Sequence, residues 1–152
     1  MEVYRIVFKK WATTLGASGN AARWNSAGNK VIYTAASRAL ACLENIVHRG
    51  GKGLNEQFKV MVIHIPASVK TDQFEISDLP DNWFEMEHYE TCRQMGDQWL
   101  MKKTSAVLRV PSAIIFNEYN FLLNPEHRDF KKIRLKRTED FKFDPRISVN
   151  AI

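Results

Sequence analysis

The sequence has no hydrophobic run that could cross a membrane. Its apolar stretches all fall short of the roughly 20 residues that a spanning helix needs. The N-terminal segment MEVYRIVFKKW alternates like a β-strand, and it lacks the apolar core and small-residue cleavage site of a signal peptide. We therefore expect a cytoplasmic protein without membrane contact.

Cysteine is scarce, with only Cys42 and Cys92, which are far apart in the chain. They form no CxxC pair, and no histidine lies at the spacing of a zinc site. Free cysteine is often a small buried hydrophobe. We interpret both residues as structural thiols and expect no metal.

The common nucleotide and hydrolase motifs are missing as well. The chain contains no GxGxxG after a strand, no GxxxxGK[ST] and no HExxH. The GASG segment at residues 16–19 is not a nucleophile elbow, because that motif needs a strand that runs directly into the turn, and none is expected there. These absences argue against hydride-transfer enzymes, P-loop enzymes, lipases and zinc enzymes.

What remains is an ordinary globular composition with a basic bias. The 152 residues are 45% hydrophobic and 26% charged, and the net charge of +5 gives a pI of about 9.3. Much of the excess lies in residues 131–137, where basic residues alternate with Ile133 and Leu135. This pattern predicts an edge or half-exposed strand with a basic outer face. Such a charge suits either an anionic partner or a solvated surface.

Hydrophobic patterning predicts short strands and two main helices rather than regular βαβ alternation. The helices are expected from Thr34 or Ser37 to His48, before Gly50-Gly51, and over 91–103. Strands are expected over residues 3–8, 31–33, 58–65, 74–76, 106–110 and 121–123, with a hairpin or two successive strands at 131–136 and 141–143. The prediction is one compact α+β domain over residues 1–152, with a mixed, partly split sheet flanked by helices.

The stretch from Gly19 to Glu44 gathers a cation, a phenol, hydroxyls and a carboxylate within one loop, one strand and one helix. On the helix, Leu40, Leu43 and Val47 outline an apolar side, and Glu44 adjoins it. A carboxylate against an apolar face is paired or functional. This stretch is therefore the predicted centre of the site.

An ordered set of short motifs resembles the RES domain family, the toxins of bacterial toxin–antitoxin pairs. Where that family usually has glycines before its first arginine, this chain has Ala21-Ala22. The residues that carry the resemblance are Ala22-Arg23-Trp24-Asn25 with Gly28, Val31-Ile32-Tyr33-Thr34-Ala35 with Ser37, Ala39-Leu40-Ala41 with Glu44, Gly96-Asp97 with Trp99, Val110-Pro111-Ser112, Glu118 with Asn120, Asn124-Pro125 with His127, and Phe143-Asp144 with Arg146.

The resemblance implies a fold like that of ADP-ribosyltransferases and NAD as the substrate. Some members of the family degrade NAD by hydrolysis or phosphorolysis, and others modify a protein target with part of the nucleotide. The implied partner is a cognate Xre-like helix-turn-helix antitoxin that covers the NAD cleft and brings DNA binding to the complex. A homodimer or a larger toxin–antitoxin assembly is compatible with the sequence.

Cleavage of the nicotinamide–ribose bond builds positive charge on the ribose, which assigns a role to each polar residue type. We predict Arg23, Tyr33, Glu44 and Ser112 as catalytic residues. The predicted NAD-binding residues are Arg23, Tyr33, Ser37, Ser112 and Asn120. Arg23 would hold phosphate with its fork of donors, Tyr33 would contact nicotinamide or ribose, and Glu44 would face the ribose.

Structural roles remain open for the same residues. Arg23 suits an ion pair, Tyr33 a core position, Glu44 a solvated helix face and Ser112 a turn. Transfer of an ADP-ribosyl or phosphoribosyl group to a protein is the alternative activity. A basic nucleic-acid-binding module, carried by residues 131–137, is the third hypothesis.

Overall fold

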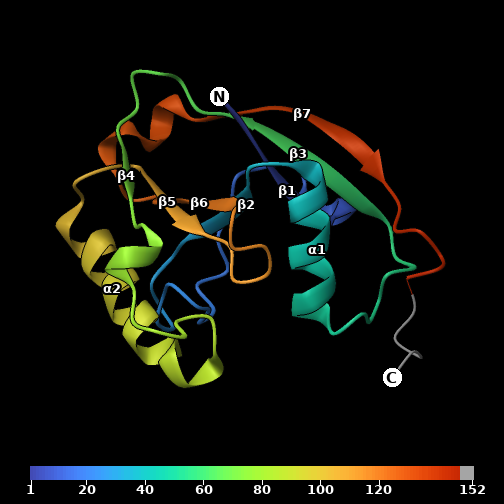
Figure 1. The fold of residues 1–152 in the computed structure, drawn as a ribbon. Coiled ribbons are helices and arrows are strands. Elements are labelled where there is room, and N and C mark those ends of the chain that lie inside the picture. The colour runs from blue at the N-terminus through green and yellow to red at the C-terminus, as the bar shows by residue number, and fades with distance from the viewer. Residues whose placement is uncertain (148–152) are drawn as a thin grey trace.

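The computed structural model describes residues 1–147, so the last five residues of the predicted domain lie outside the described part of the chain. Two α-helices, four short 3₁₀ helices and seven strands make up this part of the chain (Figure 1). The α-helices are α1 (Arg38–Arg49) and α2 (Tyr89–Lys102). The strands are β1 (Glu2–Phe8), β2 (Ile32–Ala35), β3 (Phe58–His64), β4 (Thr71–Gln73), β5 (Val107–Pro111), β6 (Tyr119–Leu123) and β7 (Arg134–Phe141).

The strands form one mixed sheet in the order β4-β5-β6-β2-β1-β3-β7. Only β4 and β5 are parallel among the described pairs. The central strands β1 and β2 share a single registered pair, Tyr4 with Ala35, whereas β1 and β3 pair along their whole length. The sheet is therefore two well-paired halves joined at a narrow seam, which confirms the predicted mixed and partly split sheet.

Each half of the sheet has its own helix. Leu40 and Ala41 of α1 pack with Ile6, Val60 and Val62 on the β1–β3 half. The α2 helix packs on the other half, where the buried cluster contains Cys92, Trp99, Leu100, Leu108 and Leu122. A third buried cluster consists mainly of strand residues, among them Val3, Ile32, Met61, Ile63, Val107 and Leu123. Both cysteines are free, Cys92 buried and Cys42 half-buried.

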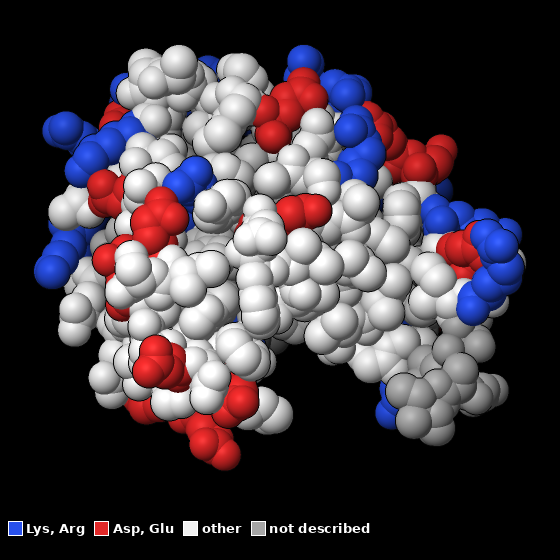
Figure 2. Space-filling model, in the orientation of Figure 1, with Lys and Arg blue, Asp and Glu red and all other residues white. Residues whose placement is uncertain are grey.

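The described elements differ from the predicted ones in two places. The expected strand at residues 74–76 lies earlier instead, at Thr71–Gln73, where it pairs with β5, and Ile76 begins a short 3₁₀ helix that Glu75 caps. The expected hairpin near the C-terminus is instead one continuous strand, β7, which pairs with β3 across a register shift at Val62/Ile63. Its edge position is as predicted, and Figure 2 shows Lys and Arg along this edge with Asp and Glu interspersed among them.

The buried side of α1 also differs from the prediction. Leu40 is 1% exposed, but Leu43 and Val47 are 40% and 59% exposed. The helix is therefore turned so that Glu44 and Asn45 face β1 and β6 with Leu40, where their side chains bond to those strands. This rotation brings the Glu44 carboxylate over the seam of the sheet.

Ser37 begins α1 as a side-chain cap, and its Oγ accepts a hydrogen bond from the Leu40 N–H at 3.1 Å. We expect Ser37→Ala to lower the free energy of unfolding by about 1 kcal/mol, because that backbone donor loses its partner. Urea denaturation measures the effect. Ser68→Ala, at an exposed position outside the helices, is the matched control and should change stability by less than about 0.5 kcal/mol. Equal stability of the two variants would contradict a capping role.

Candidate active site

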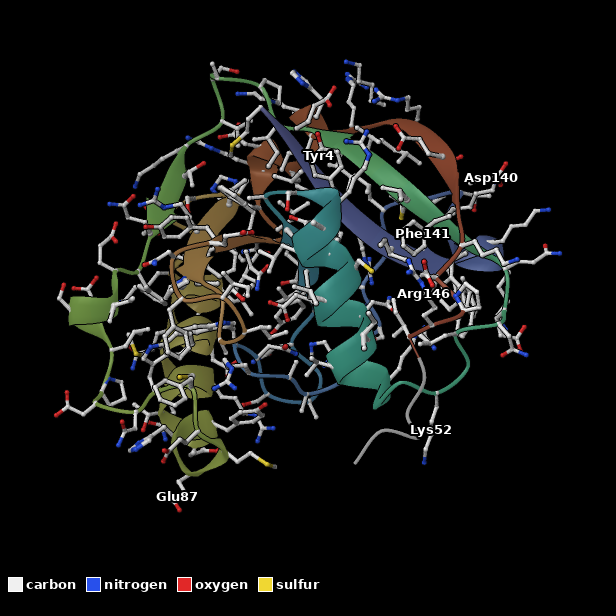
Figure 3. All side chains as sticks on the ribbon, turned by 45° about the vertical axis from the view of Figure 1, so that its right-hand side comes forward. Tyr4, Lys52, Glu87, Asp140, Phe141 and Arg146 are labelled. Atoms are coloured by element: carbon white, nitrogen blue, oxygen red, sulfur yellow. The ribbon has the colours of Figure 1, made fainter. Side chains whose placement is uncertain are left out.

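A cavity of about 210 Å³ opens where the sheet is split and α1 crosses the seam. It is smaller than the ~300–1,000 Å³ of most small-molecule pockets, so it can hold one end of a dinucleotide rather than all of it. Tyr4, labelled in Figure 3 beside the start of α1, marks its sheet side. The lining residues are Tyr4, Arg5, Ile6, Tyr33, Thr34, Ala35, Ala41, Glu44, Asn45, His48, Arg49 and Asn120.

Glu44 supplies the acidic group among the residues that line this cavity. Its Oε1 accepts hydrogen bonds from Asn120 Nδ2 at 2.6 Å and from Ser112 Oγ at 3.0 Å. The β5–β6 pairing places these donors side by side, since Ser112 directly follows β5 and Asn120 lies in β6. Three predicted site residues that are far apart in sequence therefore meet at one oxygen atom.

Ser112 is fully buried and its hydroxyl is fully engaged. While donating to Glu44, its Oγ also accepts the backbone N–H groups of Ile114 and Ile115, at 3.1 and 3.2 Å. The β5–β6 turn therefore fixes the Ser112 hydroxyl, and the hydroxyl in turn orients Glu44. This geometry favours a positioning role over direct contact with a substrate.

Asn120 has one acceptor that the fold leaves unused. Its Oδ1 is buried and has no hydrogen-bond partner within residues 1–147, although its Nδ2 holds Glu44. An unpaired buried carbonyl costs free energy. Asn120 lines the cavity, but this oxygen is itself enclosed, so a ligand N–H or O–H, such as an amide or a ribose hydroxyl, would reach it only after the side chain shifts.

Tyr33 lines the same cavity, but its hydroxyl points into the preceding loop. The O–H donates to Asn25 Oδ1 at 2.6 Å and accepts the Trp24 N–H at 3.1 Å. Burial raises the pKa of Tyr33 above its usual range, partly offset by the Trp24 hydrogen bond. The Tyr33 hydroxyl therefore stays neutral and makes hydrogen bonds that hold the loop, which leaves the ring to face a ligand.

We expect Tyr33→Phe to lower the free energy of unfolding by about 1–3 kcal/mol, because the Asn25 acceptor and the Trp24 donor lose their shared partner. Chemical denaturation measures this loss. Tyr4→Phe is the matched control, since the Tyr4 hydroxyl makes a longer, 3.3 Å bond to Glu2. A Tyr33→Phe variant no less stable than Tyr4→Phe would show that the loop does not depend on this hydroxyl.

The loop before β2 is held by the α2 helix. Asp97 accepts hydrogen bonds from the Ser26 N–H, the Ser26 hydroxyl and Asn29 Nδ2. Burial alone would raise the pKa of Asp97, but these hydrogen bonds outweigh it and hold the pKa below its usual value. Arg93 adds a bond from its Nε to the Ala22 carbonyl. The loop is thus fixed against the protein rather than free over the cavity.

Arg23, the predicted phosphate ligand, is engaged elsewhere. Its Nη1 and Nη2 donate to the carbonyls of Trp83 and Phe84 at 2.9 and 2.8 Å. Its guanidinium also lies 4.1 Å from the centre of the Tyr89 ring. Arg23 is not among the residues that line the cavity, and neither is Ser37. The NAD-binding roles of both remain predictions, which would require Arg23 to exchange these partners.

The sequence prediction omitted two arginines that do line the cavity, Arg5 in β1 and Arg49 at the end of α1. A signal for Arg5 was present, because a charge within an apolar strand needs an explanation. Arg49 had none, since a cation in the last turn of a helix is ordinary. The structure thus adds cations to the predicted carboxylate and amide.

The protein has an α+β fold, in which a split mixed sheet carries one helix over each half and a carboxylate above the split. One chain of the crystal structure of the M. tuberculosis MbcT–MbcA toxin–antitoxin complex superposes with a TM-score of 0.75 at 15% identity, covering 93% of this chain and 84% of that chain. The fold is ADP-ribosyltransferase-like, as predicted.

The family follows from sequence. The family model of the RES domain matches residues 2–144, and the chain belongs to the RES domain family. It is similar to the protein named Toxin Res of Yersinia enterocolitica, with 34% identity over 97% of this chain and 99% of the relative. It is also 35% identical to the Prs ADP-ribosylating toxin of Sphingobium sp., over 87% of this chain and 83% of the relative.

Proposed function

We propose that this chain is the toxin of a toxin–antitoxin pair and that it cleaves the nicotinamide–ribose bond of NAD, so that loss of NAD arrests growth. The observation that carries the proposal is the Glu44 carboxylate, fixed by Ser112 and Asn120 in the wall of a cavity at the seam of the sheet. The toxin names of the relatives and the ADP-ribosyltransferase-like fold support it.

In this proposal Glu44 stabilises the transition state. As nicotinamide leaves as a neutral molecule, positive charge grows on the ribose, and a fixed carboxylate nearby lowers the energy of that state more than that of the substrate. The two donors fix the carboxylate in advance, so little reorganisation is needed. Asn120 Oδ1 would accept a hydrogen bond from the nicotinamide amide or a ribose hydroxyl, and the Tyr33 ring would form a wall.

The test is to incubate the purified chain with NAD, with and without phosphate, and to follow free nicotinamide. Release in both conditions would identify water as an acceptor, and release only with phosphate would identify a phosphorylase. If the folded protein released no nicotinamide in either condition, that result would contradict the proposal that it degrades NAD.

Transfer to a protein is the second candidate, because a relative with 35% identity is named a Prs ADP-ribosylating toxin. The same bond breaks, but an amino-acid side chain replaces water or phosphate as the acceptor. Mass spectrometry of cellular protein after exposure to the chain and NAD separates the two activities. A specific ADP-ribosyl or phosphoribosyl adduct supports transfer, whereas free nicotinamide without adducts supports degradation.

For partners, we propose an Xre-like helix-turn-helix antitoxin, with DNA bound only through the antitoxin and with a homodimer or larger assembly of the pair. The nucleic-acid-binding alternative has less support, because Lys136 pairs with Glu2 and Arg137 pairs with Glu2 and Glu139.

No helix within residues 1–147 is both long and apolar enough to cross a membrane.

A further inference from the structure

An exposed apolar surface lies beside the candidate active site. Phe84, which lies before α2, and Phe116, in the β5–β6 turn, pack with their ring centres 4.8 Å apart, and Phe116 is 45% exposed. Next to them in the sequence, Met86 and Ile115 are also exposed. We call these four residues the apolar patch. Aromatic side chains and methionine are enriched at the centres of protein–protein interfaces, so the patch has the composition of a docking surface.

Arg23 holds the apolar patch in place from the protein side. Its Nη1 and Nη2 donate to the carbonyls of Trp83 and Phe84 at 2.9 and 2.8 Å. The Phe116 ring also packs on the buried Trp83, with 6.3 Å between the ring centres. The patch is therefore ordered before a partner arrives, which reduces the entropy that binding costs.

The chain around the apolar patch is acidic. Residues 71–92 contain seven acidic residues and no Lys or Arg, although the whole chain has a net charge of +5. Glu85, Glu87 and Glu118 adjoin the patch in the sequence, are exposed, and have no salt-bridge partner within residues 1–147. Figure 3 shows Glu87 pointing away from the protein near the start of α2. A complementary partner therefore presents an apolar side chain flanked by lysine or arginine.

The apolar patch lies close to Glu44 but leaves its cavity open. Phe116 is four residues after Ser112, so their Cα atoms are at most about 14 Å apart. The Ser112 hydroxyl in turn bonds to Glu44 at 3.0 Å. The cavity is lined by other residues than the four of the patch. A protein on the patch would therefore lie near the ribose of a bound NAD without displacing it.

We propose that the apolar patch docks the protein that accepts the ADP-ribosyl group. This role rests on the second candidate function, transfer to a protein. In that reaction the bond between nicotinamide and ribose C1′ breaks, and nicotinamide leaves with the bonding electron pair. C1′ then bonds to a nitrogen or oxygen atom of the acceptor, whose proton passes to water. An acceptor must bind while the cavity holds NAD, and the position of the patch allows this.

Fluorescence anisotropy of labelled model peptides tests the docking surface directly. The probe is the peptide KKLFKK, and KKSSKK has the same charge without the apolar side chains. The unaltered chain should bind KKLFKK more tightly, and binding should weaken as salt screens the acidic residues.

Phe116→Ser should weaken the binding of KKLFKK at least 10-fold, the effect of removing an aromatic anchor from an interface. Met86→Ser should weaken it several-fold, and because Met86 is 80% exposed this variant guards against loss of folding. Met101→Ser is the matched control, since Met101 is an exposed methionine near the end of α2, and it should bind as the unaltered chain does.

Two rates test the role in transfer. With NAD and a cell extract, mass spectrometry measures the specific adduct on protein, which Phe116→Ser should reduce at least 10-fold. With NAD alone, the release of nicotinamide to water should be unchanged, because the apolar patch lies outside the cavity. Equal loss of both activities in folded Phe116→Ser would assign Phe116 to the active site and overturn the docking role.

Two further results would overturn the docking surface. One is equal binding of KKLFKK and KKSSKK by the unaltered chain, and the other is unchanged binding in folded Phe116→Ser and Met86→Ser variants. Binding of KKLFKK that depends on Phe116, in a chain that forms no adduct, would refute transfer while supporting the surface. The docking surface and the transfer activity can therefore fail separately.

Discussion

Glu44→Gln is expected to reduce the release of nicotinamide from NAD by roughly 100- to 1,000-fold, the range seen when one preorganised electrostatic group is removed from an active site. The glutamine carbonyl can still accept from Ser112 and Asn120, so the hydrogen bonds that position the side chain are kept. What is lost is the negative charge opposite the developing cation. The loss should fall on kcat more than on KM, because the charge acts in the transition state.

Glu90→Gln is the matched control, since Glu90 is an exposed helical glutamate in the first turn of α2. Its rate should equal that of the unaltered chain. The free energy of unfolding of both variants, from chemical denaturation, shows whether the Glu44 variant is folded. A folded Glu44→Gln variant with full activity would remove Glu44 from the mechanism and leave its contacts as a structural bridge between α1 and the β5–β6 turn.

The elements that could be predicted were those that local patterns determine. Residues 3–8, 58–65 and 106–110 are runs of apolar and β-branched residues, and they form strands within two residues of the predicted bounds. The stop of α1 before Gly50, which adopts φ 54°, follows from glycine's tolerance of the left-handed region. Local patterns gave the wrong strand bounds near the C-terminus, because the polar residues 136–140 form a strand there only through their pairing with β3.

The site was predicted only where a residue's role depends on its chemistry. A carboxylate beside an apolar helix face needed a partner, and Glu44 has two. The pairing of β5 with β6, which brings Ser112 and Asn120 to it, is a long-range contact that composition and periodicity do not contain. The same limit hid Arg49, because only its place in the cavity identifies it, whereas Arg5 carried the signal of a charge within an apolar strand.

Gly96→Ala is expected to lower the free energy of unfolding by about 3 kcal/mol, the upper end of the usual cost of overpacking a core. Gly96 is buried in α2, and a Cβ atom there would overlap the carbonyl of Trp24. Alanine is otherwise better than glycine inside a helix by about 1 kcal/mol. Any destabilisation therefore reports the close approach of the loop to the helix.

The effect should extend to the site, because the contacts that hold this loop lie on the same helix face. Arg93 binds the Ala22 carbonyl, and Asp97 binds Ser26 and Asn29. A loop pushed away by the added methyl group loses these bonds and releases the Trp24 N–H from the Tyr33 hydroxyl, so the ring that lines the cavity is no longer fixed.

Gly16→Ala serves as the control, since a Cβ at Gly16 meets no heavy atom within 4 Å and its φ is not positive. That variant should be as stable as the unaltered chain or slightly more stable, because alanine restricts the unfolded chain. Urea denaturation of both variants gives the comparison. If Gly96→Ala unfolds at the same urea concentration as Gly16→Ala, the loop can move off α2 without cost, and Arg93 and Asp97 would not be what fixes the wall of the cavity.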